Sequence, residues 1–540
     1  MPTDNERDCG CGGSQDAPER GLSRAELLRR GIYGAASAAA LSGLGFPSAA
    51  AAGLDRLDAR PKRGGRLRVG FVGGGTTETL DPRGGLADVD IARAYNLYQR
   101  LTDFDGPRGS LRYTLAETIE PLNKTARDWI VRVKPDVEWH NGKTLGADDV
   151  IYTFKMILDP KNKLGGASDL SFIDPTRMKK VDKRTVRLHF VQPIADPRTS
   201  FGSRLVPIIQ DGFTDFAHPV GTGPFRFSSW TPGVSSLLTK FPNYHEHGLP
   251  YVDELQTIDI KDDTARLNAL KSGQIDAMQS VALADLPSVA NSQSIHLLSC
   301  AGGACIPIVM DCTQAPFTDV RVRQAFRLIA DRHQLVTNVL GGYGTIGNDL
   351  FSPFDALYDH KIPQRQHDPA QARALLSAAG QQNLTVTLYT SPVGTGYVET
   401  AQAFAQQAKA AGVTVNVQIT PTDTYFSQYY LKVPFYMINW GYWPLDEQFA
   451  LSCYSKASYN EQHFDDPQFD ALWKKARATI NITKRKAMYA QLQKILWNQG
   501  GYIVWGFQDF TDAYSAKTHG WQCSPSRPLG FYGFKRVWLS

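Results

Sequence analysis

Residues 384–419 place a strand, a helix and a second strand in immediate succession. Apolar side chains alternate with polar ones at Leu384, Val386 and Leu388, and they alternate again from Val413 to Ile419. Between these runs, apolar residues recur at helical spacing over 401–408, and Gly412 ends the pattern. The 36 residues have the size of a right-handed βαβ unit. The unit predicts an α/β fold built on a sheet with parallel strands.

Another apolar run, residues 435–440, follows this unit and predicts the next strand. The chain then turns through Gly441 into aromatics, a proline and two acids. Ligands of open α/β sheets bind beyond the carboxyl ends of strands, and pockets combine apolar walls with a few polar groups. We therefore expect Tyr442 and Trp443 to form the walls of a ligand site and Asp446 to be its polar anchor. The alternative is that these aromatics only pack in the core.

Two further residues are weaker candidates for the ligand site. Arg83 lies in the loop after the first predicted strand, where it could clamp a carboxylate or a phosphate, although a surface arginine is the simpler interpretation. Tyr343 lies in the glycine-rich segment 342–347, which matches the pattern G-x-G-x-x-G. That segment follows a predicted helix rather than a strand, so it does not indicate a nucleotide site.

Length and charge narrow the class of protein. A chain of 540 residues is too long for one core and predicts two or three domains. Its formal charge of +5 is small for this size, and no basic run stands out, so nucleic-acid binding has no support. We expect no nucleic-acid partner and a monomeric protein.

The first 52 residues have the layout of an export signal. Basic residues from Arg24 to Arg30 precede a weakly apolar stretch rich in Ala and Gly, which ends in small residues at 49–52. The order resembles a twin-arginine signal, with Ala25 at the position of the second arginine. An uncleaved membrane anchor is the alternative, but the stretch is poorly apolar for one. We expect a periplasmic protein, with residues 53–65 as a linker.

Five cysteines follow the expected signal, at positions 300, 305, 312, 453 and 523. An odd number in an exported chain permits at most two disulfides and leaves one thiol. No histidine lies near the first three with ligand spacing, so disulfides or buried thiols are favoured over a metal site. The pairing stays open.

No familiar catalytic motif is present. The chain has no G-x-S-x-G, no P-loop and no H-E-x-x-H sequence. We therefore expect a binding protein rather than an enzyme, with no catalytic residues, no cofactor and no metal. A secreted hydrolase is the rival, and it would need an acid pair or a metal site that the sequence does not reveal.

Four segments together resemble the family 5 extracellular solute-binding proteins of ABC importers, which include dipeptide, oligopeptide and nickel binders. They are W-x3-V-x3-V-x-W-H-N-G-K-x3-A-D-D-V at 129–150, V-G-T-G-P-F at 220–225, N-A-L-x2-G-Q-I-D at 268–276 and D-V-R-V-R-Q-A-F at 319–326. Each segment alone is weak. They occur in the family's order and span most of the chain after the signal.

The resemblance implies two lobes joined by two crossing strands, with the ligand between them. Lobe I would comprise residues 66–128, an inserted subdomain at 129–180, and 181–299, while lobe II would span 300–516. Residues 517–540 would return to lobe I. The closed form would engage a membrane permease.

The resemblance also bears on the ligand. Peptide-binding members place an aspartate for the ligand's amino group near position 443, where this chain has Trp443. The implied ligand is a peptide or a peptide-like solute, and the tryptophan favours stacking on a flat or cationic group. An opine, a sugar-like solute or a metal chelate is the alternative on the same fold.

Overall fold

The computed structural model describes residues 60–104, 106 and 110–540. The expected export signal at 1–52 and most of the expected linker lie outside these residues. The described part belongs to one compact unit, Leu54–Ser540. Within it, no helix has both the length and the apolar character needed to cross a membrane.

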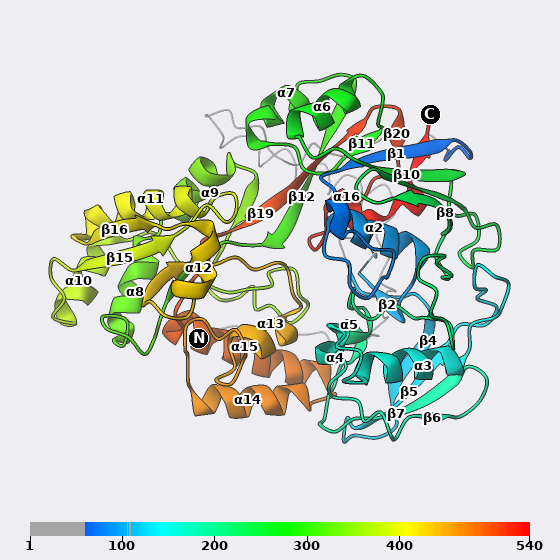
Figure 1. Cartoon of the computed structure of the whole chain (residues 1–540). Coiled ribbons are helices and arrows are strands. Elements are labelled where there is room, and N and C mark those ends of the chain that lie inside the picture. The colour runs from blue at the N-terminus through cyan, green and yellow to red at the C-terminus, as the bar shows by residue number, and fades with distance from the viewer. Residues whose placement is uncertain (1–59, 105, 107–109) are drawn as a thin grey trace, which may run out of the picture. The chain divides into compact units, whose positions relative to one another are not determined.

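The first large sheet has eight strands in the order β12-β19-β11-β1-β10-β9-β8, with β14 paired to β19 (Figure 1). In its strand β1, Leu67, Val69 and Phe71 are fully buried. β1 runs parallel to β10, while β10, β9 and β8 pair antiparallel. The strands are β1 (Arg66–Phe71), β8 (Phe225–Thr231), β9 (Ser235–Lys240), β10 (Glu254–Asp259), β11 (Ala277–Met278), β12 (Ile295–Ala304), β14 (Gly344–Ile346) and β19 (Gly506–Ser515).

Short helices accompany this sheet. The aromatic rings of α2 and α16 meet, with Tyr95 and Phe531 4.8 Å apart between ring centroids. The helices are α2 (Asp88–Leu97), α6 (Asp263–Lys271), α7 (Leu286–Ala290) and α16 (Pro528–Tyr532). A small ladder joins β20 (Thr518–His519) to β21 (Trp538–Leu539), and another joins β2 (Thr102–Asp103) to β3 (Arg112–Tyr113).

A separate antiparallel sheet has four strands in the order β4-β5-β7-β6. Helix α3 (Ala147–Leu158) buries Val150, Phe154 and Ile157. The core of this layer collects residues from Leu101 to Ile208, a wider span than the 129–180 expected for an inserted subdomain. Its elements are β4 (Ala116–Pro121), β5 (Asp128–Val133), β6 (Lys179–Lys180), β7 (Thr185–His189), α4 (Gly166–Asp169) and α5 (Arg198–Phe201).

The third sheet contains the predicted βαβ unit. Its order is β16-β15-β17-β13-β18, and β15 and β16 pair in parallel as expected. The helices α8, α10 and α11 lie beside these strands in Figure 1. The strands are β13 (Ile308–Met310), β15 (Thr385–Thr390), β16 (Thr414–Ile419), β17 (Phe435–Met437) and β18 (Tyr502–Ile503), and the helices are α8 (Val320–Ile329), α9 (Arg332–Leu340), α10 (Pro369–Ala378), α11 (Tyr397–Ala408) and α12 (Thr422–Gln428).

Two strands connect the first sheet to the third. β12 is followed by β13, and β18 is followed by β19, so the chain passes between the sheets along β12 and β19. These strands pair antiparallel with each other and lie side by side in Figure 1. Cys300 in β12 forms a disulfide with Cys523, while Cys305, Cys312 and Cys453 are free thiols.

The stretch 437–447 is less of a loop than the sequence suggests. β17 ends at Met437, and a helix, α13 (Leu445–Ser452), already begins after Pro444. Asp446 and Glu447 therefore lie in the first turn of a helix, where acidic side chains are stabilised by the helix dipole. α13 packs with α14 (Pro467–Arg477) and α15 (Ile482–Gln499) around Phe449, Phe469 and Tyr489.

Candidate functional site

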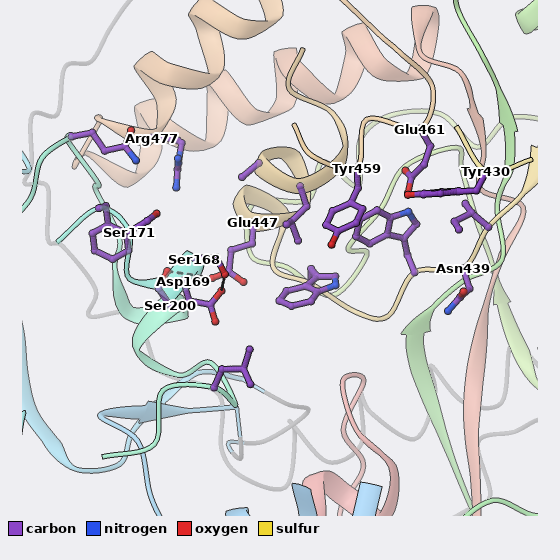
Figure 2. A pocket seen from close by; sticks show the side chains of 18 of the residues that line it. Ser168, Asp169, Ser171, Ser200, Tyr430, Asn439, Glu447, Tyr459, Glu461 and Arg477 are labelled. Atoms are coloured by element: carbon purple, nitrogen blue, oxygen red, sulfur yellow. Dashed lines mark hydrogen bonds between the residues drawn. The ribbon is translucent and has the colours of Figure 1, made fainter. Parts of the chain in front are cut away.

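A cavity of about 610 Å³ opens between α4 and α5 on one side and the segment around β17 and α13 on the other (Figure 2). Its walls include the rings of Trp440, Trp443 and Tyr459. Its polar groups include three carboxylates, which are those of Asp169, Glu447 and Glu461, and we call it the acidic cavity. The volume is that of a small-molecule site.

Glu447 and Asp169 approach the acidic cavity from different elements. Glu447 comes from the first turn of α13, and Asp169 ends α4. The Ser200 hydroxyl donates a hydrogen bond of 3.5 Å to Oε1 of Glu447, drawn as a dashed line in Figure 2. Burial, followed by the negative charge of Asp169, raises the pKa of Glu447 to about 8. Burial also raises the pKa of Asp169 above its usual range.

Glu461 lies deeper, with 1% of its surface exposed. The Tyr430 hydroxyl donates to its Oε1 at 3.0 Å, and the Tyr502 hydroxyl donates to its Oε2. Burial raises its pKa to about 7, although these hydrogen bonds act in the opposite direction. Figure 2 shows Glu461 and Tyr430 together at one end of the cavity, apart from Glu447, which lies beside Asp169 and Ser200.

Arg477 is the cation among the residues that line the acidic cavity, and it is already paired. Its Nε lies 2.9 Å from Oδ2 of Asp446. A carboxylate buried without a cation costs free energy unless it takes up a proton. The cavity therefore suits a ligand that brings positive charge or hydrogen-bond donors, and its aromatic rings suit a flat or cationic group.

A second cavity, of about 420 Å³, adjoins the first and shares Leu205, Trp443 and Glu447 with it. Arg204 and Arg527 line it, so we call it the arginine cavity. Aromatic side chains form much of its remaining surface, from Tyr95, Phe104, Tyr442, Phe510 and Phe531. Arg204, which precedes β8, and Arg527, which follows β19, thus line the same cavity.

Two of the predicted site residues line these cavities. Trp443 faces both cavities, and its backbone oxygen accepts a hydrogen bond of 2.7 Å from the Ser352 hydroxyl. Tyr442 lines the arginine cavity and also a smaller one of about 260 Å³. The structure brings these two together at the start of α13.

Asp446, the predicted polar anchor, lines neither the acidic cavity nor the arginine cavity. It lines the smaller cavity, and its carboxylate accepts hydrogen bonds of 2.9 Å from Nε1 of Trp473 and from Nε of Arg477. The Tyr489 hydroxyl is a further donor. These contacts tie α13 to α14 and α15. Its neighbour Glu447 is the acid that reaches the larger cavities.

Arg83 and Tyr343 line none of these three cavities. Nη2 of Arg83 pairs with Oδ2 of Asp81 at 2.5 Å, and its guanidinium lies 4.1 Å from the ring centroid of Phe216. Tyr343 packs at the edge of a core cluster that includes Leu270 and Ile275. The structure does not bring either residue next to Trp443.

Sequence reasoning misses Asp169, Glu461, Arg204 and Arg527. Asp169 is the last residue of the short helix α4, Arg204 lies in the irregular stretch after α5, and Arg527 lies in the C-terminal tail. No local pattern marks them, because packing of distant segments brings them together. Glu447 adjoins Asp446, so the acid pair was a signal for it.

The family model of the bacterial extracellular solute-binding proteins, family 5 (middle), matches residues 111–462. The glutathione-binding protein GsiB of Pectobacterium atrosepticum is 26% identical over 478 residues, which cover 85% of this chain and 92% of that protein.

Solved structures agree in fold. HbpA2 from Haemophilus parasuis superposes with a TM-score of 0.78 at 20% identity, covering 88% of this chain and 100% of that one. The periplasmic binding protein DppA from Helicobacter pylori, in complex with the peptide STSA, gives a TM-score of 0.70 at 19% identity, covering 88% and 98%. The described chain therefore has the two-lobed fold of periplasmic binding proteins, as expected, with β12 and β19 as its two connections.

Proposed function

Because the chain belongs to the bacterial extracellular solute-binding proteins of family 5, we propose that it captures a peptide or peptide-like solute between its lobes for an ABC importer. A membrane permease would receive the solute from the closed form. The solute would lie in the acidic and arginine cavities. Its amino group or another cationic group would face Glu447, Asp169 and Glu461.

The observation that carries this proposal is the acidic cavity itself. It is large enough for a small solute, has aromatic walls and contains three carboxylates, while its arginine is neutralised by Asp446. An α-amino group or a cationic side chain would supply the missing positive charge. The relative GsiB is named as a binder of glutathione, which is a peptide, and this supports the choice of a peptide over a sugar-like solute.

Trp443 replaces the expected aspartate in this arrangement. Glu447, four residues further along the chain, supplies a carboxylate to the same cavity from the first turn of α13. Trp443 would then stack on the solute, and the acid would lie beside it. The anchor for the amino group is thus displaced along the chain.

We also propose that the chain binds its solute stoichiometrically without turnover, as a monomer and without nucleic acid. Residues 1–52 direct export and are removed, by a twin-arginine-like or a general secretion route. Multi-angle light scattering and N-terminal sequencing of the exported protein test the oligomeric state and the cleavage site.

Native mass spectrometry of the protein mixed with a pool of tri- and tetrapeptides tests the function. We expect one bound peptide per chain. Trp443→Ala should weaken its binding by about 1–3 kcal/mol, because the truncation removes a buried aromatic wall. Isothermal titration calorimetry of the retained peptide measures this loss.

Trp230→Ala is the matched control. Trp230 lies in β8 and lines none of the three cavities, so its loss should leave the affinity unchanged. Retention of no peptide from the pool contradicts the proposed function. An unchanged affinity of Trp443→Ala removes that residue from the site while leaving the function in place.

A further inference from the structure

Arg204 and Arg527 are two arginines that face the same cavity without a carboxylate partner among the described residues. Nη1 of Arg204 donates to the backbone oxygen of Gly85 at 2.8 Å, and this is its side chain's one hydrogen bond there. The guanidinium of Arg527 has no hydrogen-bond partner in the same part of the chain. By contrast, the buried Arg332 is paired with Asp349 at 2.6 Å.

The two guanidinium groups also repel each other. The pKa of Arg204 is lowered, first by burial and then by the positive charge of Arg527. Like charges held together in a partly desolvated place cost free energy unless an anion lies between them. Their arrangement is therefore suited to a planar anion, which guanidinium groups bind through parallel hydrogen bonds.

The acids of the same cavity do not supply that anion. Asp88 lines it as well, but its carboxylate already accepts hydrogen bonds from the Tyr532 hydroxyl, at 2.5 Å, and from the Gln279 amide. Glu447 lies at the boundary with the acidic cavity, and its pKa of about 8 keeps it largely protonated at neutral pH. The anion must come from outside the chain.

Arg527 lies in a segment whose backbone is constrained on both sides. Four residues before it, Cys523 is linked to β12 by a disulfide, and the Pro525 oxygen accepts a 2.8 Å hydrogen bond from the Gly303 amide. Just after it, Leu529 and Phe531 have left-handed φ angles of 49° and 66°. Such conformations are costly for residues with side chains and persist where the surroundings enforce them, often at ligand sites.

We propose that Arg204 and Arg527 form an anion subsite that binds a carboxylate of the solute. The inference rests on the proposed function and deepens it. The carboxylate lies in the arginine cavity, and the amino or other cationic group lies in the acidic cavity. Because the two cavities meet at Trp443 and Glu447, the solute binds in one orientation and carries both charges.

Matched peptide pools test the subsite. One pool contains tri- and tetrapeptides with free carboxyl groups, and the other contains the same peptides after conversion to methyl esters. The protein is incubated with each pool, and the bound fraction is identified by native mass spectrometry. We expect retention of free acids and about 10- to 100-fold weaker retention of their esters, since a charge-assisted pair of hydrogen bonds is lost.

Substitutions locate the effect. Arg527→Gln and Arg204→Gln should each weaken binding of the retained acid by about 10-fold or more, and should leave the affinity for its ester nearly unchanged. Arg527→Lys keeps the charge and should recover part of the loss. Arg187→Gln is the control, because Arg187 lies on the exposed side of β7 and pairs with Asp128 at 3.1 Å. Circular dichroism at the assay temperature verifies that each variant is folded.

Three outcomes overturn the subsite. Equal retention of acids and esters would do so while leaving peptide capture intact. Loss of affinity that is equal for acids and esters in Arg527→Gln and Arg204→Gln would assign these residues a structural role only. Retention of nothing from either pool would contradict the proposed function and the subsite with it.

Discussion

Glu447 is a carboxyl group whose ionisation the fold strongly opposes. Its pKa rises from an ordinary value of 4.5 to about 8 in the folded chain. The groups that face it are Asp169 from α4, Ser200 and Thr199 from α5, and Asp446 and Arg477 from α13 and α14. Glu461, with a pKa of about 7, behaves in the same direction.

The sign of the effect on stability follows from linkage. A carboxyl group with a raised pKa holds its proton in the folded state at a pH where the unfolded chain has lost it. Its contribution is complete below about pH 4.5 and is lost as the pH rises through about 8. We therefore expect the melting temperature of the ligand-free protein to fall between pH 5 and pH 8.

Glu447→Gln should flatten this decline, because glutamine keeps the shape of the side chain and cannot ionise. The slope that remains would come from Glu461 and other groups. Differential scanning calorimetry from pH 5 to pH 8 measures it, and Glu399→Gln, at an exposed position in α11, is the control. An identical slope in Glu447→Gln and the native protein would refute the assignment.

At the scale of elements, the disulfide fastens the C-terminal segment to β12. Cys300 and Cys523 are separated by 223 residues, so the bond closes a very long loop. Cys523 is exposed and open to reductant. Disulfides typically stabilise a fold by about 2–4 kcal/mol, because they constrain the unfolded chain. The same bond holds Arg527 in the arginine cavity.

We expect the double variant Cys300→Ser, Cys523→Ser to lose about 2–4 kcal/mol of unfolding free energy, measured by denaturant titration. It should also bind an acidic solute more weakly, because the segment that carries Arg527 is released. Dithiothreitol should lower the stability of the native protein and leave the double variant unchanged. Equal sensitivity of both proteins to the reductant would show that this bond does not form.

Elements with a local signature could be predicted from the sequence, and others could not. The unit from β15 to β16 alternates and then shifts to helical spacing, so its own residues specify it. β19 carries polar residues such as Gln508, Asp509 and Asp512 within its run, and its strand form depends on pairing with β12. Trp443 and Tyr442 follow a strand end, which indicated a site. Arg204 and Arg527 acquire their place only through packing between segments more than 300 residues apart.

At the scale of the whole molecule, direct contacts join residues 195–200 to α13, α14 and α15. Nη2 of Arg485 lies 3.2 Å from Oδ2 of Asp196, and the Ala195 amide donates to the Arg477 oxygen at 2.6 Å. The Ser200–Glu447 hydrogen bond lies nearby. These contacts must break if the acidic cavity opens widely, so they stabilise the closed arrangement.

Arg485→Gln should therefore favour an open form. We expect a larger radius of gyration for the ligand-free variant in small-angle X-ray scattering, and an affinity lower by about 3- to 10-fold, since closing recovers about 1 kcal/mol less. Arg187→Gln should match the native protein in both measurements. A variant with unchanged scattering and affinity would mean that this ion pair has no part in closure.

The pairing of β12 with β19 limits what such an opening can be. Both connections belong to one hydrogen-bonded ribbon, so neither can slide past the other without losing its ladder. The ribbon can still twist and bend as a whole, because small changes of backbone angle spread over many residues cost little. The lobes would then rotate relative to each other, with the ribbon as the hinge. The cavity walls would separate least near Gly303 and Arg527, where the segment 523–527 is held to β12, so a solute held at its carboxylate would be released from its cationic end first.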